Sequence, residues 1–293
     1  MIPKYRLAIF FAILAAVLYA ISMPLSKILL RYVQPMMMAA FLYIGAGVGM
    51  SIFGIVRERV KLPDKEEKLK RKDLPFTVAM VVLDIAAPIF LMFGLKITAA
   101  ANASLLNNFE IVATAVIAML LFHEKVSRRL WTAIVLVTLA CILLTVDDTS
   151  SLNFSYGSLL VLAACACWGL ENNCTRCISH KDPMEIVIIK GFGSGCGALC
   201  IALSIGEVFP LWQYVPAVML LGFVAYGLSI FFYTYAQRTI GAAMTSTFYA
   251  VAPFVGMLLS FIILSEKLTW IFGVALVIMM AGAYFAVVDG RGK

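Results

Sequence analysis

The sequence predicts an all-α integral membrane protein with ten transmembrane helices, arranged as two inverted five-helix repeats around a central cavity. Composition is the first observation behind this fold class. Of 293 residues, 63% are hydrophobic and only 13% are charged, whereas roughly a quarter of the residues of a soluble domain are charged. In addition, ten apolar stretches follow one another with short connections, and features of the first half of the chain recur in the second.

Each stretch holds about the 20 apolar residues that a helix needs to cross a hydrocarbon core of about 30 Å. The predicted spans are 7–30, 35–56, 75–95, 102–122, 128–146, 156–179, 184–205, 214–235, 242–264 and 268–288. The longest connection, from Arg57 to Asp73, is lysine-rich and too short for a further domain. The first span follows Lys4 and Arg6, as in a signal peptide, but no small-residue cleavage pattern precedes Arg31. We therefore expect this span to remain as a helix.

The basic residues gather on one side of the predicted topology. Seventeen Lys and Arg residues lie on the side of the N-terminus, eight of them between Arg57 and Lys72, and three lie on the opposite side. Such a bias places the richer side in the cytoplasm. We expect both termini to be cytoplasmic and the protein to be integral to the plasma (cell inner) membrane. The formal net charge of +7 then requires no nucleic-acid partner.

An internal repeat divides the chain. A shift of 142 residues lays Ile97–Asp147 over Thr239–Asp289 without a gap. The matched positions include Ala100-Ala101 with Ala242-Ala243, Ser104 with Ser246, Glu124-Lys125 with Glu266-Lys267 and, at a shift of 149, Lys27 with Arg176. Because each repeat has an odd number of spans, residues 1–147 and 148–293 must enter the membrane in opposite directions. Inverted repeats can open a central cavity alternately to either side, which favours a transporter.

The ordered set of features resembles the ten-span EamA-type branch of the drug/metabolite transporter superfamily over the whole chain. The resemblance rests on aromatic-small pairs (Tyr19-Ala20, Trp168-Gly169), on Ala- and Ser-rich starts of the fourth helices, and on Glu124 and Glu266 at the ends of those helices. It implies a small-molecule carrier, in many members an exporter. It also implies a cavity lined by the first, third and fourth helices of each half, with peripheral fifth helices. Tyr19 stands where a tryptophan is common in that family.

Three acidic residues fall near the middle of predicted spans: Asp84 in the third, Glu110 in the fourth and Glu171 in the sixth. An ionised acid at this depth costs about 2.5–3.5 kcal/mol. Each acid should therefore face a wet cavity, pair with a cation or bind a proton. The alternative is a protonated acid that bonds to a neighbouring helix. We expect all three in the substrate site, with Glu110 and Asp84 as candidates for proton coupling.

Polar and aromatic residues at helical spacing surround these acids. They are Asn107, Glu110 and Thr114 in the fourth span, and Trp168, Glu171, Asn172 and Thr175 in the sixth. Residues spaced by three and four lie on one helical face. The 142-residue shift places Tyr249 opposite Asn107 and Tyr226 opposite Asp84. The predicted substrate site consists of Tyr19, Asp84, Asn107, Glu110, Trp168, Glu171, Asn172, Tyr226 and Tyr249.

Other residues inside the spans have a structural interpretation or two open ones. Pro88 and Pro253 each remove a backbone hydrogen bond beside the candidate site and should bend their helices. Lys190 either extends toward the cytoplasmic surface or neutralises one of the acids. For Arg176 we favour extension to that surface. The glycines of the seventh span, at positions 191, 193, 195 and 197, are expected to serve helix packing.

No metal or cofactor is expected. Cys174 and Cys177 have the spacing of metal ligands, but His123 and His180 lie outside the spans and complete no site. The seven cysteines all fall in spans, where they pack as small apolar residues. The spans also lack the clustered catalytic groups of an enzyme, so we expect no enzymatic activity.

Carboxylates among aromatic rings suit an amine or a quaternary ammonium group. The predicted function is a secondary transporter, by resemblance an exporter, that moves a small amine-bearing metabolite such as an amino acid. Proton exchange and uncoupled facilitation both remain open. The alternatives are an anion or phosphorylated-metabolite exchanger that uses Lys27, Arg176 and Lys190, and a membrane-embedded enzyme or receptor. The expected partners are a small-molecule substrate and membrane lipid, in a monomer or homodimer.

Overall fold

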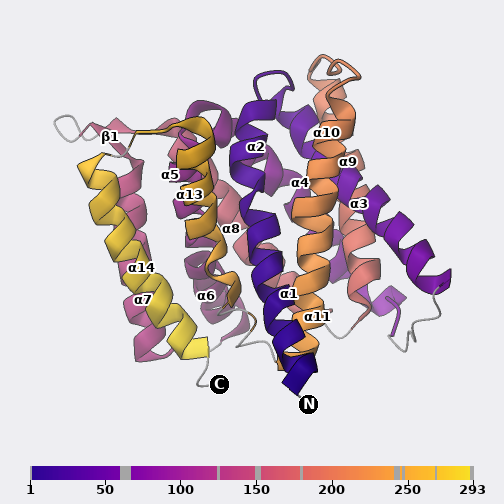
Figure 1. Ribbon diagram of the computed structural model, residues 1–293, viewed down its shortest axis with the longest axis horizontal. Helices are drawn as coiled ribbons and strands as arrows, with labels where there is room; N and C mark the ends of the chain where they lie inside the picture. Colours follow the sequence, from indigo (N-terminus) through magenta and orange to yellow (C-terminus); the bar gives the residue numbers. More distant parts are fainter. Residues whose placement is uncertain are drawn as a thin grey trace.

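The computed structural model of the protein describes residues 2–59, 67–123, 126–148, 153–178, 181–240, 245, 248–267 and 269–290. Within these residues the fold is helical, apart from a short hairpin in which β1 (Val146–Asp148) pairs antiparallel with β2 (Asn153–Phe154). The helices lie side by side in a bundle, and both chain termini lie at the same end of it (Figure 1). We call this the terminal end and the opposite one the far end.

The helices from the N-terminus to the hairpin are α1 (Ile2–Ala20), α2 (Ser22–Leu29), α3 (Pro35–Arg59), the 3-10 turn η1 (Arg71–Asp73), α4 (Leu74–Ile97), α5 (Ala100–Leu106), α6 (Phe109–Phe122) and α7 (Arg128–Thr145). Those after the hairpin are α8 (Tyr156–Cys177), α9 (Pro183–Ser204), α10 (Val215–Gly222), the π-helix η2 (Phe223–Leu228), α11 (Ser229–Ile240), α13 (Ala252–Leu264) and α14 (Trp270–Gly290). Each of the ten predicted spans overlaps at least one of these helices.

Eight helical segments in the described part of the chain are long and apolar enough to cross a membrane. They are Tyr5–Leu29, Pro35–Val56, Arg71–Ile97, Ala100–Leu121, Arg128–Thr145, Pro183–Ser204, Val215–Ala236 and Trp270–Val288. The predicted sixth span, α8, is long but carries polar residues over its second half, and α13 is apolar but shorter. The structure thus agrees with an all-helical membrane protein, and the number of ten spans remains a prediction.

Two of the predicted spans each form one helical segment that is interrupted by a short turn near its middle. The first divides into α1 and α2 at Ile21, because Pro24 has no N–H to offer to the carbonyl of Ala20. The fourth divides into α5 and α6 at Asn107 and Asn108. There the Asn108 side chain donates to the Leu105 carbonyl at 3.0 Å, and such local bonds compete with the helix.

The two other prolines near the candidate site have different effects. Helix α4 continues through Pro88, and the missing N–H leaves the carbonyl of Asp84 without its helical donor. The sequence suggested that Pro253 lies in the interior of a helix, and this prediction is wrong. Pro253 is the second residue of α13, which begins after a turn at Ala250 and Val251. At the start of a helix a proline removes no helical hydrogen bond.

The main helix pairs are α4 with α8, α3 with α9, α7 with α14 and α1 with α11. Glycines allow the closest of these approaches. A Cβ atom on Gly191 would lie 2.4 Å from the backbone nitrogen of Gly47, so the backbones of α9 and α3 are in contact. Gly195 also faces α3, whereas Gly193 and Gly197 face side chains of α4. The predicted packing role of these glycines is confirmed.

Helices α7 and α14 form one edge of the bundle, at the left of Figure 1. They pack mainly against each other, and large apolar side chains on their outer faces stay exposed, such as Trp131, Leu139, Val277 and Tyr284. An exposed apolar surface of this kind suits contact with lipid. This arrangement agrees with the peripheral position expected for the fifth helix of each half.

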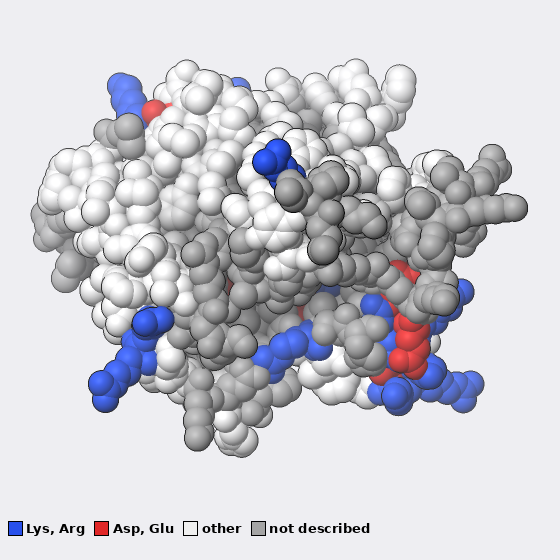
Figure 2. Space-filling view, turned by 60° about the horizontal axis from the view of Figure 1, so that its bottom comes forward, with Lys and Arg blue, Asp and Glu red and all other residues white. Residues whose placement is uncertain are grey.

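Many charged side chains of the described residues lie at the terminal end. Figure 2 brings this end forward and shows Lys and Arg side chains along it, with a group of Asp and Glu beside them. Lys68, Arg71, Arg128 and Arg129 are exposed there. Residues 67–73, the described part of the lysine-rich connection, thus lie at the end that holds both termini, where the predicted topology places them.

Candidate functional site

Three charged residues from three helices meet in the middle of the bundle. Lys190 on α9 places its Nζ 2.6 Å from Oε1 of Glu171 on α8 and 3.3 Å from Oδ2 of Asp84 on α4. The carboxylate side chains are 2% and 3% exposed, and that of Lys190 is 15% exposed. Of the two interpretations of Lys190, the structure therefore selects neutralisation of the acids. We call Asp84, Glu171 and Lys190 the central triad.

Hydroxyl groups donate one further hydrogen bond to each carboxylate of the triad. The hydroxyl of Tyr43 on α3 donates to Oδ1 of Asp84 at 3.2 Å, and the Thr175 hydroxyl, one turn along α8, donates to Oε1 of Glu171. Buried charges are tolerated when they are paired and hydrogen-bonded in this way. With all groups ionised, the two carboxylates and one ammonium carry one net negative charge.

Glu110 forms a second, separate part of the site. It lies on α6 just after the break at Asn107 and Asn108, and its Oε1 accepts a hydrogen bond of 2.7 Å from the Asn172 amide. The same amide donates to the Thr114 hydroxyl at 3.3 Å. Glu110 is partly exposed and forms no ion pair with any described residue. It is the acid of the centre whose charge has no direct cation partner.

Close packing of α8 on α6 brings Asn172 within hydrogen-bonding distance of Glu110. A Cβ atom on Gly169 would lie 2.6 Å from that of Ala113 and 2.8 Å from the Thr114 nitrogen, so only glycine fits. Asn172 follows Gly169 by three residues and thus faces α6 on the same side. Glu171, its neighbour in sequence, faces Asp84 and Lys190 instead. Helix α8 therefore serves both parts of the site.

Aromatic rings from four helical segments lie beside the acids. The Tyr19 ring centroid is 5.9 Å from that of Tyr226 and 5.8 Å from that of Tyr249, and the Tyr43 centroid is 5.5 Å from that of Tyr226. The Asn107 amide reaches the Tyr19 hydroxyl at 3.5 Å. Since Tyr43 also binds Asp84, the rings and the central triad form one continuous site.

The π-helix η2 positions one of these rings. Tyr226 lies within its six residues, and π-helical turns inside α-helices are frequent at functional sites. Ser229, at the start of α11, donates to the Ala15 carbonyl at 2.9 Å and lies 3.3 Å from the Tyr249 hydroxyl. This bonding joins α1, α11 and the segment before α13 around the rings.

The structure brings nearly all of the predicted site residues together. Asp84 and Glu171 meet in the triad, Glu110 binds Asn172, and Asn107 lies with the tyrosines. Trp168 is buried on α8 beside Tyr43. Tyr43 was not among the predicted residues, and Lys190 was predicted as a partner of one acid only as one of two alternatives. A lone hydroxyl in an apolar span was the available signal for Tyr43.

The basic residues of the alternative anion site do not converge. Lys27 donates to the carbonyls of Leu95, Lys96 and Thr98 at the end of α4, at 2.6, 3.1 and 2.6 Å. Arg176 is exposed, as expected for extension to the surface. With Lys190 held by two carboxylates, these three cations offer no common site for an anion.

Two glutamates cap helices at the far end. Glu266 accepts from the backbone nitrogens of Ala100 and Ala101 at 2.7 and 2.8 Å, at the start of α5. Glu207 does the same for Met36 and Met37 at the start of α3, at 3.2 and 2.8 Å. A negative charge at a helix N-terminus is favourable. The repeat-related positions Glu124, Lys125, Ala242, Ala243 and Ser246 lie outside the described residues.

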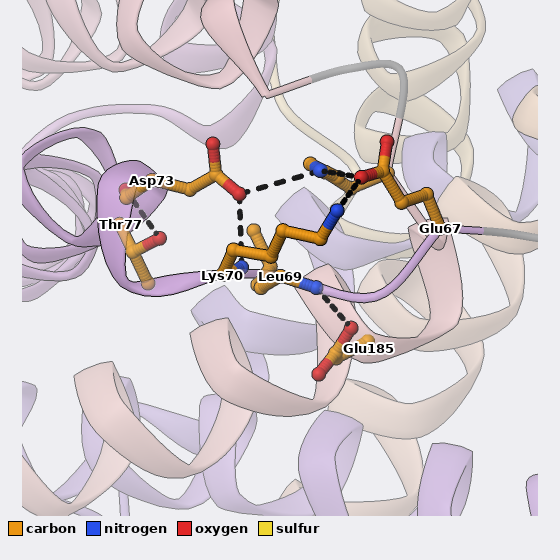
Figure 3. A network of polar contacts seen from close by, with 7 residues as sticks. Glu67, Leu69, Lys70, Asp73, Thr77 and Glu185 are labelled. Atoms are coloured by element: carbon orange, nitrogen blue, oxygen red, sulfur yellow. Dashed lines mark hydrogen bonds and ion pairs between the residues drawn. The ribbon is translucent and has the colours of Figure 1, made fainter.

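A network of charges at the terminal end joins the connection before α4 to the one between α8 and α9 (Figure 3). Lys181 lies 3.1 Å from Glu67 and 3.5 Å from Asp73, and Glu67 also pairs with Lys70. The Leu69 nitrogen donates to Glu185 at 2.9 Å. Hydrogen bonds from Lys70 and then Lys181 lower the pKa of Glu67 from 4.5 to about 2. We call Glu67, Lys70, Asp73 and Lys181 the terminal network.

Comparisons with known proteins agree with this arrangement. The model of the EamA-like transporter family matches residues 6–146 and 155–288. An uncharacterized transporter of Methanothermobacter thermautotrophicus is 28% identical, over 95% of this chain and 85% of its own length. The uncharacterized transporter YyaM of Bacillus subtilis is 21% identical, over 87% of this chain and 86% of its own.

A crystal structure with 17% identical residues superposes with a TM-score of 0.68 over 97% of each chain. At that identity the likeness concerns the fold alone. The family match spans nearly the whole chain, and the apolar helices agree with it. The chain therefore belongs to the EamA-like transporter family and is an integral membrane protein.

Proposed function

We propose that the protein is a secondary transporter that exports a small amine-bearing metabolite, such as an amino acid or a quaternary amine, across the plasma membrane. The observation that carries this proposal is Glu110, a partly exposed carboxylate in the middle of the bundle whose partner is the neutral Asn172 amide. A carboxylate at this depth marks a substrate or proton pathway. Tyr19 and Tyr249 lie close enough to Glu110 to interact with it electrostatically, and aromatic rings attract ammonium groups.

Glu110 is also the better of the two candidates for proton coupling. Asp84 shares Lys190 with Glu171 and is 2% exposed, so a proton or substrate reaches it only after the triad opens. Glu110 has no such competitor. A proton and an ammonium group would bind the same carboxylate in turn, and this competition would couple the export of an amine to the uptake of a proton.

Alternating access would follow from two inverted repeats, residues 1–147 and 148–293, each with five spans. The helix pairs support this arrangement because they exchange consistently between the halves. The pair α4 with α8, the third and sixth spans, corresponds to α11 with α1, the eighth and first. The pairs α3 with α9 and α7 with α14 each correspond to themselves. A pseudo-two-fold axis in the membrane plane requires such matched pairs.

The orientation and partners complete the proposal. The bias of seventeen basic residues to three supports cytoplasmic termini, so the terminal end would face the cytoplasm. The transporting unit would be a single chain, in a monomer or a homodimer surrounded by lipid. Its ligand is a small molecule and not a nucleic acid.

Proton flux in proteoliposomes tests the proposal. An outward gradient of ethylammonium, choline or a neutral amino acid should drive proton uptake in the wild type, reported by a trapped pH-sensitive dye. Glu110→Gln keeps the hydrogen bond to Asn172 but removes the charge, so we expect the amine-dependent signal to be lost. Glu207→Gln, an acid outside the site, serves as the matched control and should retain it. Unchanged flux in Glu110→Gln would exclude Glu110 from the mechanism.

A further inference from the structure

We propose that Lys190 is a tethered ammonium group that fills a second amine-binding position, between Asp84 and Glu171, and thereby restricts the transporter to substrates with a single amino group. The restriction on substrates rests on the proposed function. The binding position itself rests on the geometry of the triad alone.

The triad has the composition of an ammonium site. Nζ of Lys190 lies 2.6 Å from Oε1 of Glu171, the distance of a charge-assisted hydrogen bond, and 3.3 Å from Oδ2 of Asp84, the distance of an ion pair. Hydroxyl groups of Tyr43 and Thr175 hold both carboxylates from the side. A lysine side chain is an alkylammonium on a flexible stem, so a small free amine could take its place.

The second position is adjacent to the first. Glu171 and Asn172 follow one another on α8, and one faces the triad while the other binds Glu110. Glu110 lies close enough to interact electrostatically with both Glu171 and Lys190. The centre thus offers two neighbouring places for an ammonium group, and the protein's own lysine occupies one.

Occupation of the second position by Lys190 then decides which amines bind. With all groups ionised, three carboxylates and Lys190 leave two negative charges, and a monoamine at Glu110 reduces them to one. A diamine would have to place its second ammonium beside Lys190, where like charges repel in a medium of low dielectric constant. Without Lys190 the same diamine would find three carboxylates and leave one negative charge. Lys190 therefore favours monoamines and excludes diamines.

Chemical rescue tests the position without any need for transport. Purified Lys190→Ala should be stabilised by ethylammonium, because this ion restores the missing charge between Asp84 and Glu171. We expect its unfolding temperature to rise by about 5 °C at saturating ethylammonium, with little change in the wild type. We also expect 1,3-diaminopropane to bind this variant at least about tenfold more tightly than the wild type, as measured by titrated thermal shifts.

Three further variants control the experiment. Lys190→Arg retains a cation and should gain neither response. The triple variant Asp84→Asn, Glu171→Gln, Lys190→Ala lacks both carboxylates and should not respond to ethylammonium. If Lys190→Ala does not fold, Asp84→Asn with Lys190→Ala keeps the net charge of the wild-type triad, and Glu171 should still bind ethylammonium. The proposal is overturned if neither Lys190→Ala nor Asp84→Asn with Lys190→Ala responds to ethylammonium. It is also overturned if the triple variant responds as strongly as they do.

The outcomes separate this proposal from the proposed function. If ethylammonium rescues Lys190→Ala but proteoliposomes transport no amine, the amine-binding position stands and the transport proposal fails. If wild-type proteoliposomes transport monoamines while the lysine-free variants show no rescue and still reject 1,3-diaminopropane, the transport proposal stands. The role of Lys190 is then wrong.

Discussion

Two lysines of this protein are each held by two carboxylates, one in the middle of the bundle and one at its terminal end. Lys190 binds Asp84 and Glu171, which are 2% and 3% exposed. The side chain of Lys181 is fully buried, but its partner Glu67 is 46% exposed and also binds Lys70. The groups are chemically the same, but one acid of the terminal network, Glu67, is open to water, whereas Asp73 and both acids of the triad are buried.

This difference decides how strongly the charges depend on one another. In the terminal network, water can hydrate Glu67 when a partner is removed, so an exposed pair contributes little to stability. In the central triad both carboxylates are almost fully buried, and removing one member of a buried pair costs about 3–5 kcal/mol. An arrangement with such interdependent charges suits a place where a cation must bind and leave.

The largest expected effect is that of Lys190→Ala without added amine. Two buried carboxylates lose their cation, and we expect the unfolding temperature of the purified protein to fall by about 10 °C. The matched variant Lys181→Ala should lower it by roughly 4 °C, mainly through lost packing of the buried stem. Equal losses in a thermal unfolding assay would show that access to water does not distinguish the two lysines.

In the central region, the sequence predicts the depth of the acids but not their partners. Asp84, Glu110 and Glu171 could be assigned to the middle of the bundle because apolar stretches of fixed length determine depth in a bilayer. Their partners could not, because the pairing of Lys190 with two of them depends on how α9 is rotated against α3 and α4. That rotation follows from close contacts such as Gly191 on Gly47, which a pattern of hydropathy does not contain.

Helix breaks were similarly hidden. The apolar pattern continues through Asn107 and Asn108, and through the residues of η2, so it predicts unbroken spans. Whether an asparagine side chain binds the backbone or faces a neighbouring helix depends on what packs against it. Two of the three residues predicted to share a face do so, since Glu110 and Thr114 both accept from Asn172, whereas Asn107 donates to the Tyr19 hydroxyl.

Glu266, which caps α5 at the far end, is a partly buried acid that can be compared with the acids of the triad and of the terminal network. Glu266 accepts hydrogen bonds from two backbone nitrogens of α5. Its removal therefore leaves two N–H groups without an acceptor, but it leaves no buried charge without a partner. Glu266→Ala should cost about 1 kcal/mol, seen as a fall of about 3 °C in unfolding temperature. Glu207→Ala, which removes the equivalent cap of α3, should have a similar effect. No change in either variant would mean that water replaces these caps without loss.

The smallest expected effect is that of Glu67→Gln, and it should depend on pH. The pKa of Glu67 is lowered from 4.5 to about 2 by Lys70 and Lys181, so its ionised form stabilises the folded state above pH 4.5. That contribution declines as the pH falls toward 2. Wild type and Glu67→Gln should therefore differ in unfolding temperature by on the order of 1 °C at pH 6, and by less at pH 3.

Lys70→Gln, which removes the first cause of the pKa shift, should weaken this pH dependence. High salt should also reduce the difference, since Glu67 and Lys70 are exposed. A difference that is constant across pH and salt would instead assign the effect to packing, and the contrast between the two lysines would lose its electrostatic basis.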